Sequence, residues 1–408
     1  MKKIILSLMA LSSLTVSAQF GAPRQNPTVP SVTENVVEDF KPATSNQDSK
    51  QYPMVNSQRM VRAQISAPNA TAVGLDIAGK IYSMTKDENG VWTGTSEPQD
   101  EGFHYYQLNI DGASVPDPGS LYYYGASRWG SGIEIPSTDQ DFWQVKNVPQ
   151  GSMNEVFYWS TYTEKMRRCH VYLPNEYFTN PTKKFPVLYL QHGMGENEYG
   201  WAEQGHTAQI LDNLIAEGKA VPCIIVMDNG LNTSRPGEAG GFGGFGGPRP
   251  QGQRPQGAPG QGGPRRGGFG GFSEGFKNVL FNDIIPMVEK NYRVIADPQH
   301  RAYAGLSMGG MQAREITLAN PEKFAYVGSF SSGAWSVDQV KNSEGFAKNV
   351  KLLFMSGGGK ENMGCVEAAK NIKEQLGMNA VGYESPGTAH EWHTWRRSLY
   401  QFAQLMFK

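Results

Sequence analysis

Residues 300–320 read HRAYAGLSMGGMQAREITLAN and place one serine, Ser307, between Gly305 and Gly309. The run RAYAG before the serine is typical of a short buried strand, and GGMQAREITLAN begins a helical pattern. Glycines two residues before and two residues after a serine permit the sharp strand-to-helix turn that exposes a hydroxyl group. A serine hydroxyl attacks a carbonyl only when it protrudes and a base removes its proton. The stretch therefore predicts an α/β fold with Ser307 as a candidate nucleophile.

The sequence around this turn, residues 150–408, has the texture of an α/β domain. Apolar runs such as FPVLYLQHG (185–193) and VPCIIVMDNG (221–230) alternate with helical patterns such as TAQILDNLIAEGKA (207–220). Buried parallel strands with crossover helices produce such runs, because helices cover both faces of the sheet.

Residues 57–145 have a different pattern, one of short alternating segments. GFHYYQLNIDG (102–112) alternates with period two, and Asn89 and Gly90 stand where a tight hairpin requires two positive φ angles. We expect a small β-sandwich of the immunoglobulin-like kind.

Three further segments belong to neither pattern. Residues 1–18 carry two lysines, an apolar run and a small-residue cleavage pattern, which predicts a signal peptide. Residues 19–56 are rich in Asn, Pro, Ser and Thr, and we expect a flexible leader. Residues 236–272 are glycine and proline with a few arginines, which predicts a disordered insertion. It follows a strand end that faces the ligand crevice in open α/β sheets.

Composition limits the possible partners. The 408 residues carry a formal net charge of −1, which gives no electrostatic reason to expect nucleic acid or an anionic membrane. No segment after residue 18 reaches the roughly 18 unbroken apolar residues of a membrane span. The signal peptide predicts a secreted or periplasmic protein. The three cysteines, Cys169, Cys223 and Cys365, are expected to be buried thiols without metal-ligand spacing.

A base for Ser307 should come from late in the chain, since the order in such folds is serine, acid, histidine. His390 and His393 qualify. Apolar residues step by three and four from Trp392 onward, which predicts a helix that begins there. His390 then lies in the loop before the helix and can turn toward the nucleophile, whereas His393 occupies a solvated helix face.

The acid should follow the strand VKLLFMSGGG (350–359), and the next acidic residue is Glu361. Asp338, after the preceding strand, is the alternative. Glu391 neighbours His390, and a helix N-terminal charge is the role we expect for it. Two backbone N–H groups should form an oxyanion hole, one from Met308 and one from Met194 in the loop after residues 185–193.

Three stretches together carry a family resemblance: YLQHGMGENEYGW (189–201), AGLSMGGMQA (304–313) and HEWHTWRR (390–397). They resemble carbohydrate esterase family 1, the feruloyl and acetyl xylan esterases of the α/β-hydrolase fold. The resemblance covers roughly residues 150–408. Residues 66–118 are similar to the family 48 carbohydrate-binding modules that often precede such esterases.

The resemblance implies a serine esterase that removes feruloyl or acetyl groups from plant cell-wall xylan without a metal or organic cofactor. It supports Ser307 as nucleophile, His390 as base and the HGMG loop as oxyanion donor. Trp201 is a candidate for lining the acyl pocket or, equally, a core residue. Many relatives have Gly-Lys-Glu-Asp where this chain has Asn362 as the last residue. This departure leaves open a glycan-binding protein with a weakened hydrolase site. A general aryl esterase, thioesterase or peptidase on the same fold is a separate alternative.

Overall fold

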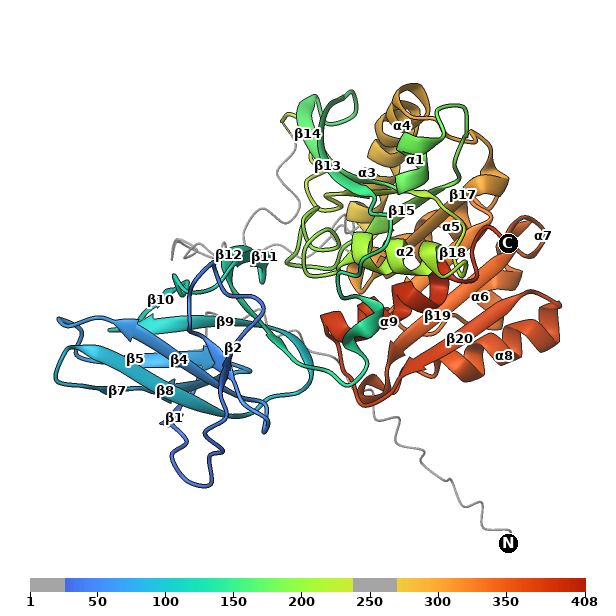
Figure 1. The fold of residues 1–408 in the computed structure, drawn as a ribbon. Coiled ribbons are helices and arrows are strands. Elements are labelled where there is room, and N and C mark those ends of the chain that lie inside the picture. Colours follow the sequence, from blue (N-terminus) through green and yellow to red (C-terminus); the bar gives the residue numbers. More distant parts are fainter. Residues whose placement is uncertain (1–25, 238–269) are drawn as a thin grey trace, which may run out of the picture.

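The computed structural model describes residues 26–237 and 270–408, which form a β-domain beside an α/β domain (Figure 1). The predicted signal peptide and residues 238–269 of the predicted insertion lie outside the described residues. Helix α3 begins at Gly270, so the last three residues assigned to the insertion are helical. Within the described ranges, every helix is too short or too polar to cross a bilayer.

The β-domain consists of two sheets that share one apolar core. The strands of the larger sheet are, in spatial order, β1 (Thr28–Pro30), β6 (Lys80–Ser83), β5 (Val73–Ile77), β9 (Gly102–Ile110), β12 (Arg128–Ile135) and β11 (Tyr122–Gly125), with β10 (Ala113–Val115) paired to β9. Those of the smaller sheet are β2 (Lys41–Pro42), β3 (Met54–Val55), β4 (Met60–Ser66), β8 (Val91–Pro98) and β7 (Thr85–Lys86).

The predicted leader, residues 19–56, differs from the structure over its described part. β1 pairs with β6, and β2 and β3 extend the smaller sheet from its edge. Strands of two or three residues are too short to show the period of two that identifies a strand in a sequence. Only the polar composition of the segment was left to interpret, and that composition is typical of a flexible segment. The leader prediction is therefore wrong from residue 26 onward.

The turn between β7 and β8 also differs in detail from the expectation. Gly90 has φ 80°, whereas Asn89 keeps a negative φ. The connection is a four-residue turn in which the Asp87 carboxylate accepts from the N–H groups of Asn89 and Val91. One left-handed residue therefore suffices, as in hairpins with longer loops.

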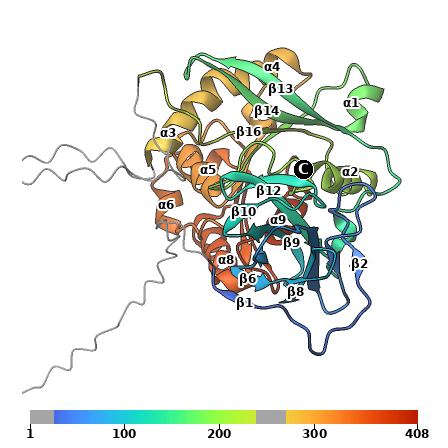
Figure 2. The same cartoon turned by 90° about the vertical axis from the view of Figure 1, so that its left-hand side faces the viewer.

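Strand β9 serves both domains because its side chains alternate between two faces. Tyr106 and Leu108 point into the core of the β-domain. Phe103 and Tyr105 pack against the core of the α/β domain. Figure 2, viewed from the side of the β-domain, shows β9, β10 and β12 in front of the α/β domain.

The α/β domain is built on an eight-stranded sheet whose last six strands in spatial order run parallel. In spatial order its strands are β13 (Ser152–Ser160), β14 (Lys165–Leu173), β16 (Ile224–Asp228), β15 (Val187–Gln191), β17 (Arg301–Leu306), β18 (Tyr326–Phe330), β19 (Leu352–Gly358) and β20 (Ala380–Ser385). The antiparallel hairpin β13–β14 at one edge was not predicted from the sequence.

Helices cover both faces of this sheet, as the apolar runs predicted. Helices α2 and α9 pack on the face that also meets the β-domain, and α3 to α8 pack on the other face. The helices of the described residues are α1 (Asn175–Thr179), α2 (Thr207–Ala216), α3 (Gly270–Val279), α4 (Ile285–Asn291), α5 (Met308–Ala319), α6 (Val337–Lys341), α7 (Phe346–Asn349), α8 (Cys365–Leu376) and α9 (Trp392–Ala403), with a π-turn η2 (Leu280–Ile284) and 3₁₀ turns η1 (Gln140–Phe142), η3 (Pro298–His300) and η4 (Gly359–Glu361). Cys169, Cys223 and Cys365 are buried free thiols, which confirms that prediction.

Candidate active site

Ser307 occupies the turn between β17 and α5 with φ 50° and ψ −114°, a conformation that non-glycine residues rarely adopt. Glycine is required at both flanking positions, because backbone atoms of other residues approach too closely to leave room for a side chain. A Cβ on Gly305 would lie 2.4 Å from the Gly309 carbonyl carbon, and one on Gly309 would lie 2.6 Å from the carbonyl oxygens of Gln191 and His192. The turn can therefore form only with glycine at both positions, and it lifts the serine side chain above the sheet.

Three side chains from three different loops form one line of hydrogen bonds. The Oγ of Ser307 lies 3.0 Å from Nε2 of His390, and Nδ1 of the same ring lies 2.7 Å from Oε1 of Glu361. His390 lies in the loop before α9, and Glu361 ends the 3₁₀ turn that follows β19. The sheet thus brings together all three residues that the sequence singled out.

The carboxylate of Glu361 is held from its other oxygen as well. Oε2 accepts hydrogen bonds of 2.7 Å from the Ser331 hydroxyl and from the Gly358 N–H. Burial alone would raise the pKa of Glu361, but the hydrogen bonds from His390, Ser331 and Gly358 outweigh it and lower the pKa. The carboxylate is therefore ionised at neutral pH and faces the imidazole. Ser331 was not found from the sequence, because a serine in a loop carries no pattern of its own.

The alternative acids lie elsewhere. Asp338 is exposed in the first turn of α6. Asn362, at the usual aspartate position, is exposed and left-handed with φ 52°. Glu391 is the residue before α9 and accepts a 3.0 Å hydrogen bond from the Ala389 N–H, near the positive end of that helix.

His393 is not the solvated residue that helical periodicity predicted. Its side chain is 0% exposed, its Nε2 lies 3.1 Å from Oδ1 of Asp139, and a Cβ on Gly102 of β9 would lie 2.7 Å from its Cβ. Burial, aided by Arg397, lowers the pKa of His393 to about 4. The ring is therefore neutral at pH 7 and is part of the contact between the two domains. That prediction was wrong because the face of α9 opposite its apolar stripe is covered by the β-domain.

The loop after β15 approaches Ser307 at Gly193, where an added Cβ would lie 3.4 Å from the serine Cβ. His192 braces this loop: Nε2 accepts from the Gly230 N–H at 3.1 Å, so Nδ1 carries the proton and donates to the Gly193 carbonyl at 2.7 Å. Burial lowers the pKa of His192 to about 4, which keeps the ring neutral and its tautomer fixed. Because the peptide is trans, the Met194 N–H points away from that carbonyl.

The second predicted donor, Met308, is the first residue of α5. The first N–H groups of a helix have no partner within the helix, and they carry the positive end of its dipole. The N–H group of Met308, directly after Ser307, therefore has no acceptor within the helix and lies at its positive end, as an oxyanion donor requires.

Trp201 does not line a substrate pocket. Its side chain is 1% exposed, its Nε1 donates to the Gln191 carbonyl at 3.0 Å, and its ring packs edge-on against Phe330 and Trp392. Of the two roles expected from the sequence, the structure supports the core residue, since a large apolar ring is most stable when buried.

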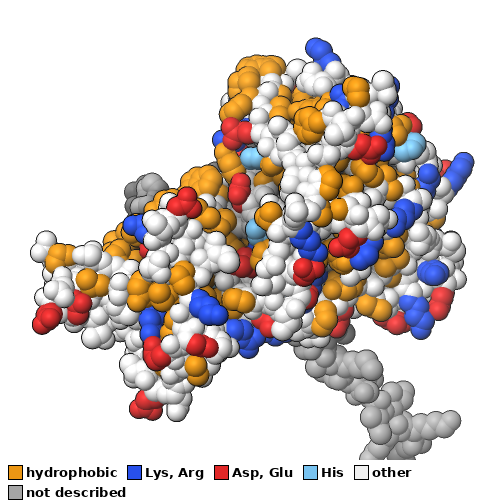
Figure 3. Space-filling model, in the orientation of Figure 1, with side chains coloured by type: hydrophobic (Ala, Val, Ile, Leu, Met, Phe, Trp, Pro, Cys, Tyr) orange, Lys and Arg blue, Asp and Glu red, His pale blue; other side chains and the backbone are white. Residues whose placement is uncertain are grey.

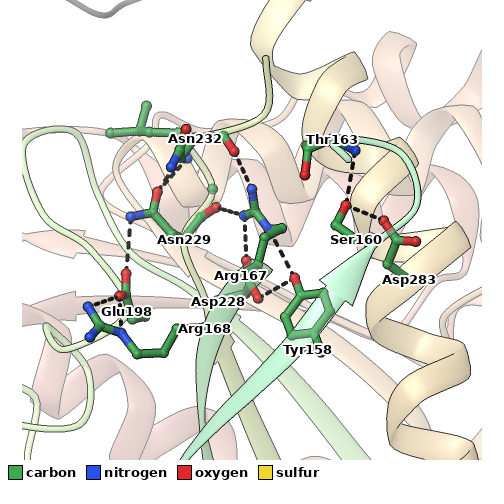
Figure 4. A network of polar contacts seen from close by, with 12 residues as sticks. Tyr158, Ser160, Thr163, Arg167, Arg168, Glu198, Asp228, Asn229, Asn232 and Asp283 are labelled. Carbon is green, nitrogen blue, oxygen red and sulfur yellow. Dashed lines mark hydrogen bonds and ion pairs between the residues drawn. The ribbon is translucent and has the colours of Figure 1, made fainter. Parts of the chain in front are cut away.

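A polar network anchors the loop that follows β16, on the other side of the site (Figure 4). The buried guanidinium of Arg167 forms an ion pair with Asp228 and donates to the carbonyl oxygens of Asn229 and Asn232. The Tyr158 hydroxyl donates to Asp228 at 2.6 Å. Because Gly230 in this loop bonds to His192, the network also fixes the brace of the loop after β15.

Comparison with known proteins places this geometry in a family. A model of the esterase family matches residues 160–405. The chain belongs to the esterase family. An endo-1,4-beta-xylanase/feruloyl esterase from Xylanibacter ruminicola is 42% identical over 380 residues. The match covers 91% of the chain and 48% of that relative, so the chain spans about half the relative's length.

Solved structures agree in fold. A ferulic acid esterase from Anaeromyces mucronatus, in complex with ferulic acid, is 22% identical with a TM-score of 0.50, covering 66% of this chain and 96% of that chain. The enterobactin esterase from Shigella flexneri, in the presence of enterobactin, is 15% identical with a TM-score of 0.57, covering 85% and 92%. These likenesses establish the α/β-hydrolase fold of the larger domain.

Proposed function

We propose that the chain is a secreted serine esterase that removes feruloyl or acetyl groups from plant cell-wall xylan. The observation that carries the proposal is the continuous line from Ser307 Oγ through His390 to the ionised Glu361, at a turn strained in the way that exposes a nucleophile. An intact line of this kind favours an active enzyme over a glycan-binding protein with a weakened site.

In the proposed mechanism, His390 Nε2 takes the proton of Ser307 as Oγ attacks the ester carbonyl. Glu361 stabilises the imidazolium and holds its orientation. The N–H groups of Met308 and Met194 donate to the oxyanion. His390 then returns the proton to the departing alcohol, and water hydrolyses the acyl-enzyme through the same steps in reverse order.

The substrate class rests on the relative from Xylanibacter ruminicola, whose name includes both xylanase and feruloyl esterase. The predicted signal peptide supports export, which would bring the enzyme to an extracellular polymer. We further propose that the β-domain is an immunoglobulin-like module of the family 48 type that contacts the polysaccharide. Tyr122 and Trp129, exposed on β11 and β12, support that contact, because aromatic faces stack on sugar rings.

A hydrolysis panel of methyl ferulate, acetylated xylan and p-nitrophenyl acetate tests the proposal. Ser307→Ala should abolish activity on every substrate that the wild-type protein hydrolyses. Retained activity in this variant would refute the nucleophile assignment. Hydrolysis of peptides or acyl thioesters, but of none of the three esters, would favour the peptidase or thioesterase alternatives.

A further inference from the structure

One side chain of the β-domain contacts both the loop after β15 and the start of α9, beside the loop of His390. The hydroxyl of Tyr105, from β9, accepts hydrogen bonds from Trp392 Nε1 at 3.1 Å and from Gln204 Nε2 at 2.7 Å. It lies 3.3 Å from Oε1 of Glu196, to which it donates. Trp392 is two residues after His390, and Glu196 is two residues after Met194. A single phenol therefore ties the loop of the base to the loop of the oxyanion donor.

A second contact from the β-domain reaches the same loop. The turn between β11 and β12 contains Ala126 and Ser127, both with positive φ. The Ser127 N–H donates to the carbonyl of Gly195 at 2.7 Å, and a Cβ on Gly195 would lie 3.6 Å from the Ala126 Cα. The hairpin tip thus rests on the residue directly after Met194.

The same hairpin is fixed to the α/β domain on its other side. Gln204 Nε2, which donates to Tyr105, also donates to the Tyr124 carbonyl of β11 at 2.8 Å. Tyr123 packs edge-on against Phe103 at 4.8 Å between ring centroids. The tip that meets Gly195 is therefore held from two directions and cannot move independently of β9.

We propose that the β-domain is a positioning element of the active site, in which Tyr105 and the turn at residues 126–127 hold the Met194 and His390 loops in register with Ser307. The inference deepens the proposed function and rests on it. It assigns the β-domain a role in the turnover of small esters, in addition to any contact with polysaccharide. Tyr105 is a positioning residue, since it acts through Glu196 and Trp392.

The physical reason is that Met194 reaches the oxyanion only if its loop keeps one conformation. A donor displaced by about 1 Å can cost up to about a hundredfold in rate, because transition-state stabilisation depends steeply on geometry. Binding of a small ester makes little use of these loops. The effect should therefore fall on kcat and leave KM nearly unchanged.

Two matched pairs of full-length variants test the proposal with p-nitrophenyl acetate. Tyr105→Phe removes the bridging hydroxyl, and Tyr106→Phe removes a buried hydroxyl that bonds at 2.8 Å to Asp117 inside the β-domain. Ser127→Pro removes the N–H that meets Gly195, and Ser49→Pro changes another exposed residue of positive φ in the same domain. Melting temperature is measured for all four variants.

We expect Tyr105→Phe and Ser127→Pro to lower kcat by about tenfold or more, with KM within about twofold. Tyr106→Phe and Ser49→Pro should affect only the melting temperature. A kcat for Tyr105→Phe within twofold of that for Tyr106→Phe would overturn the role of Tyr105. If Tyr105→Phe fails to fold, Ser127→Pro decides, and an unchanged kcat there overturns the proposal. If the Ser307→Ala variant hydrolyses p-nitrophenyl acetate as fast as the wild-type protein does, the proposed function itself is refuted.

Discussion

Glu361 approaches His390 to 2.7 Å with one carboxylate oxygen while the other oxygen is held by Ser331 and Gly358. An amide at this position could not stabilise the imidazolium, and it would favour the wrong tautomer. Glu361→Gln should therefore keep the fold and lower kcat by about 10⁴-fold, as in other triads. Asp338→Asn should change kcat less than twofold. Steady-state kinetics with methyl ferulate distinguishes the two acids, and a larger loss in Asp338→Asn would contradict the assignment.

The aspartate that many relatives carry should not restore activity here. Asn362 is exposed and left-handed, one residue beyond the carboxylate that faces His390. Adding Asn362→Asp to Glu361→Gln should leave kcat at the level of the single variant. Recovery to within tenfold of wild type would show that the loop can present either residue to the imidazole.

The two histidines of residues 390–397 should respond differently. His390→Ala should lower kcat by about a million-fold with little change in melting temperature, because triad members act as a unit. His393→Ala removes a fully buried ring and should cost on the order of 2–5 kcal/mol of unfolding free energy with a small effect on kcat. Urea unfolding and kinetics on both variants provide the check. Equal kinetic losses would contradict the choice of base.

The sequence predicted the central strands, the turn at Ser307 and the start of α9 because local rules govern them. The glycines around Ser307 are required by backbone contacts within the turn and the adjacent loop, and the apolar runs of the central strands mark burial on both faces. The helix predicted at Trp392 begins there.

The surroundings of α9 could not be predicted in this way. Arg396 and Glu134 are 262 positions apart in the sequence, and no local period reports that they meet. Burial of the polar face of α9 depends on where the β-domain docks, which is set by tertiary contacts. For the same reason Tyr105 looked like one more residue of an alternating strand.

The Arg396–Glu134 pair offers a direct measure of that docking. Arg396 is 0% exposed and donates to both carboxylate oxygens of Glu134, at 2.7 and 3.0 Å. Glu134→Gln would leave a buried guanidinium without its counter-charge, at a cost of about 3–5 kcal/mol of unfolding free energy. The control is Glu38→Gln, which breaks the more exposed pair with Arg62 and should leave the free energy of unfolding nearly unchanged, because solvent screens that pair. Similar costs for both variants would contradict a buried, paired charge between the domains.

Glu196 should give stability a pH dependence. Burial raises the pKa of Glu196 to about 8 from an ordinary value of 4.5, so between these limits the folded state binds a proton that the unfolded state has lost. Stability therefore falls as pH rises through this window, by up to about 1.4 kcal/mol per pH unit, and the loss is complete above pH 8. Glu196→Gln removes the titration and keeps an acceptor for Tyr105. Urea unfolding at pH 5, 6.5 and 8 should show that the stability of Glu196→Gln relative to the wild-type protein increases as pH rises. Unfolding free energies that change with pH by the same amount in both proteins would contradict the raised pKa.

The exposed aromatic residue Trp129 provides the test of polysaccharide contact. Its side chain is 49% exposed, and its ring lies edge-on to Tyr199 at 5.2 Å and to Tyr124 at 5.6 Å. Ser127, two residues earlier, contacts the loop of Met194, so a sugar ring stacked on Trp129 would lie beside that loop. Figure 3 shows further apolar side chains (orange) at the top of the α/β domain. Strand β13 carries the exposed Phe157 and Trp159, and β14 carries the exposed Met166.

Holding a chain at this point raises the local concentration of polymer-borne ester without changing the chemistry. Trp129→Ala should therefore lower kcat/KM on feruloylated arabinoxylan by about tenfold, equivalent to about 1.4 kcal/mol of binding, while kcat/KM on methyl ferulate stays within twofold. Phe178→Ala is the control, since Phe178 is a comparably exposed aromatic residue on α1, far from the β-domain in Figure 1. It should leave both substrates unaffected. Equal losses on polymer and small ester in Trp129→Ala would mean that the residue supports the Met194 loop, and no loss on either would leave the polymer without a contact at β12.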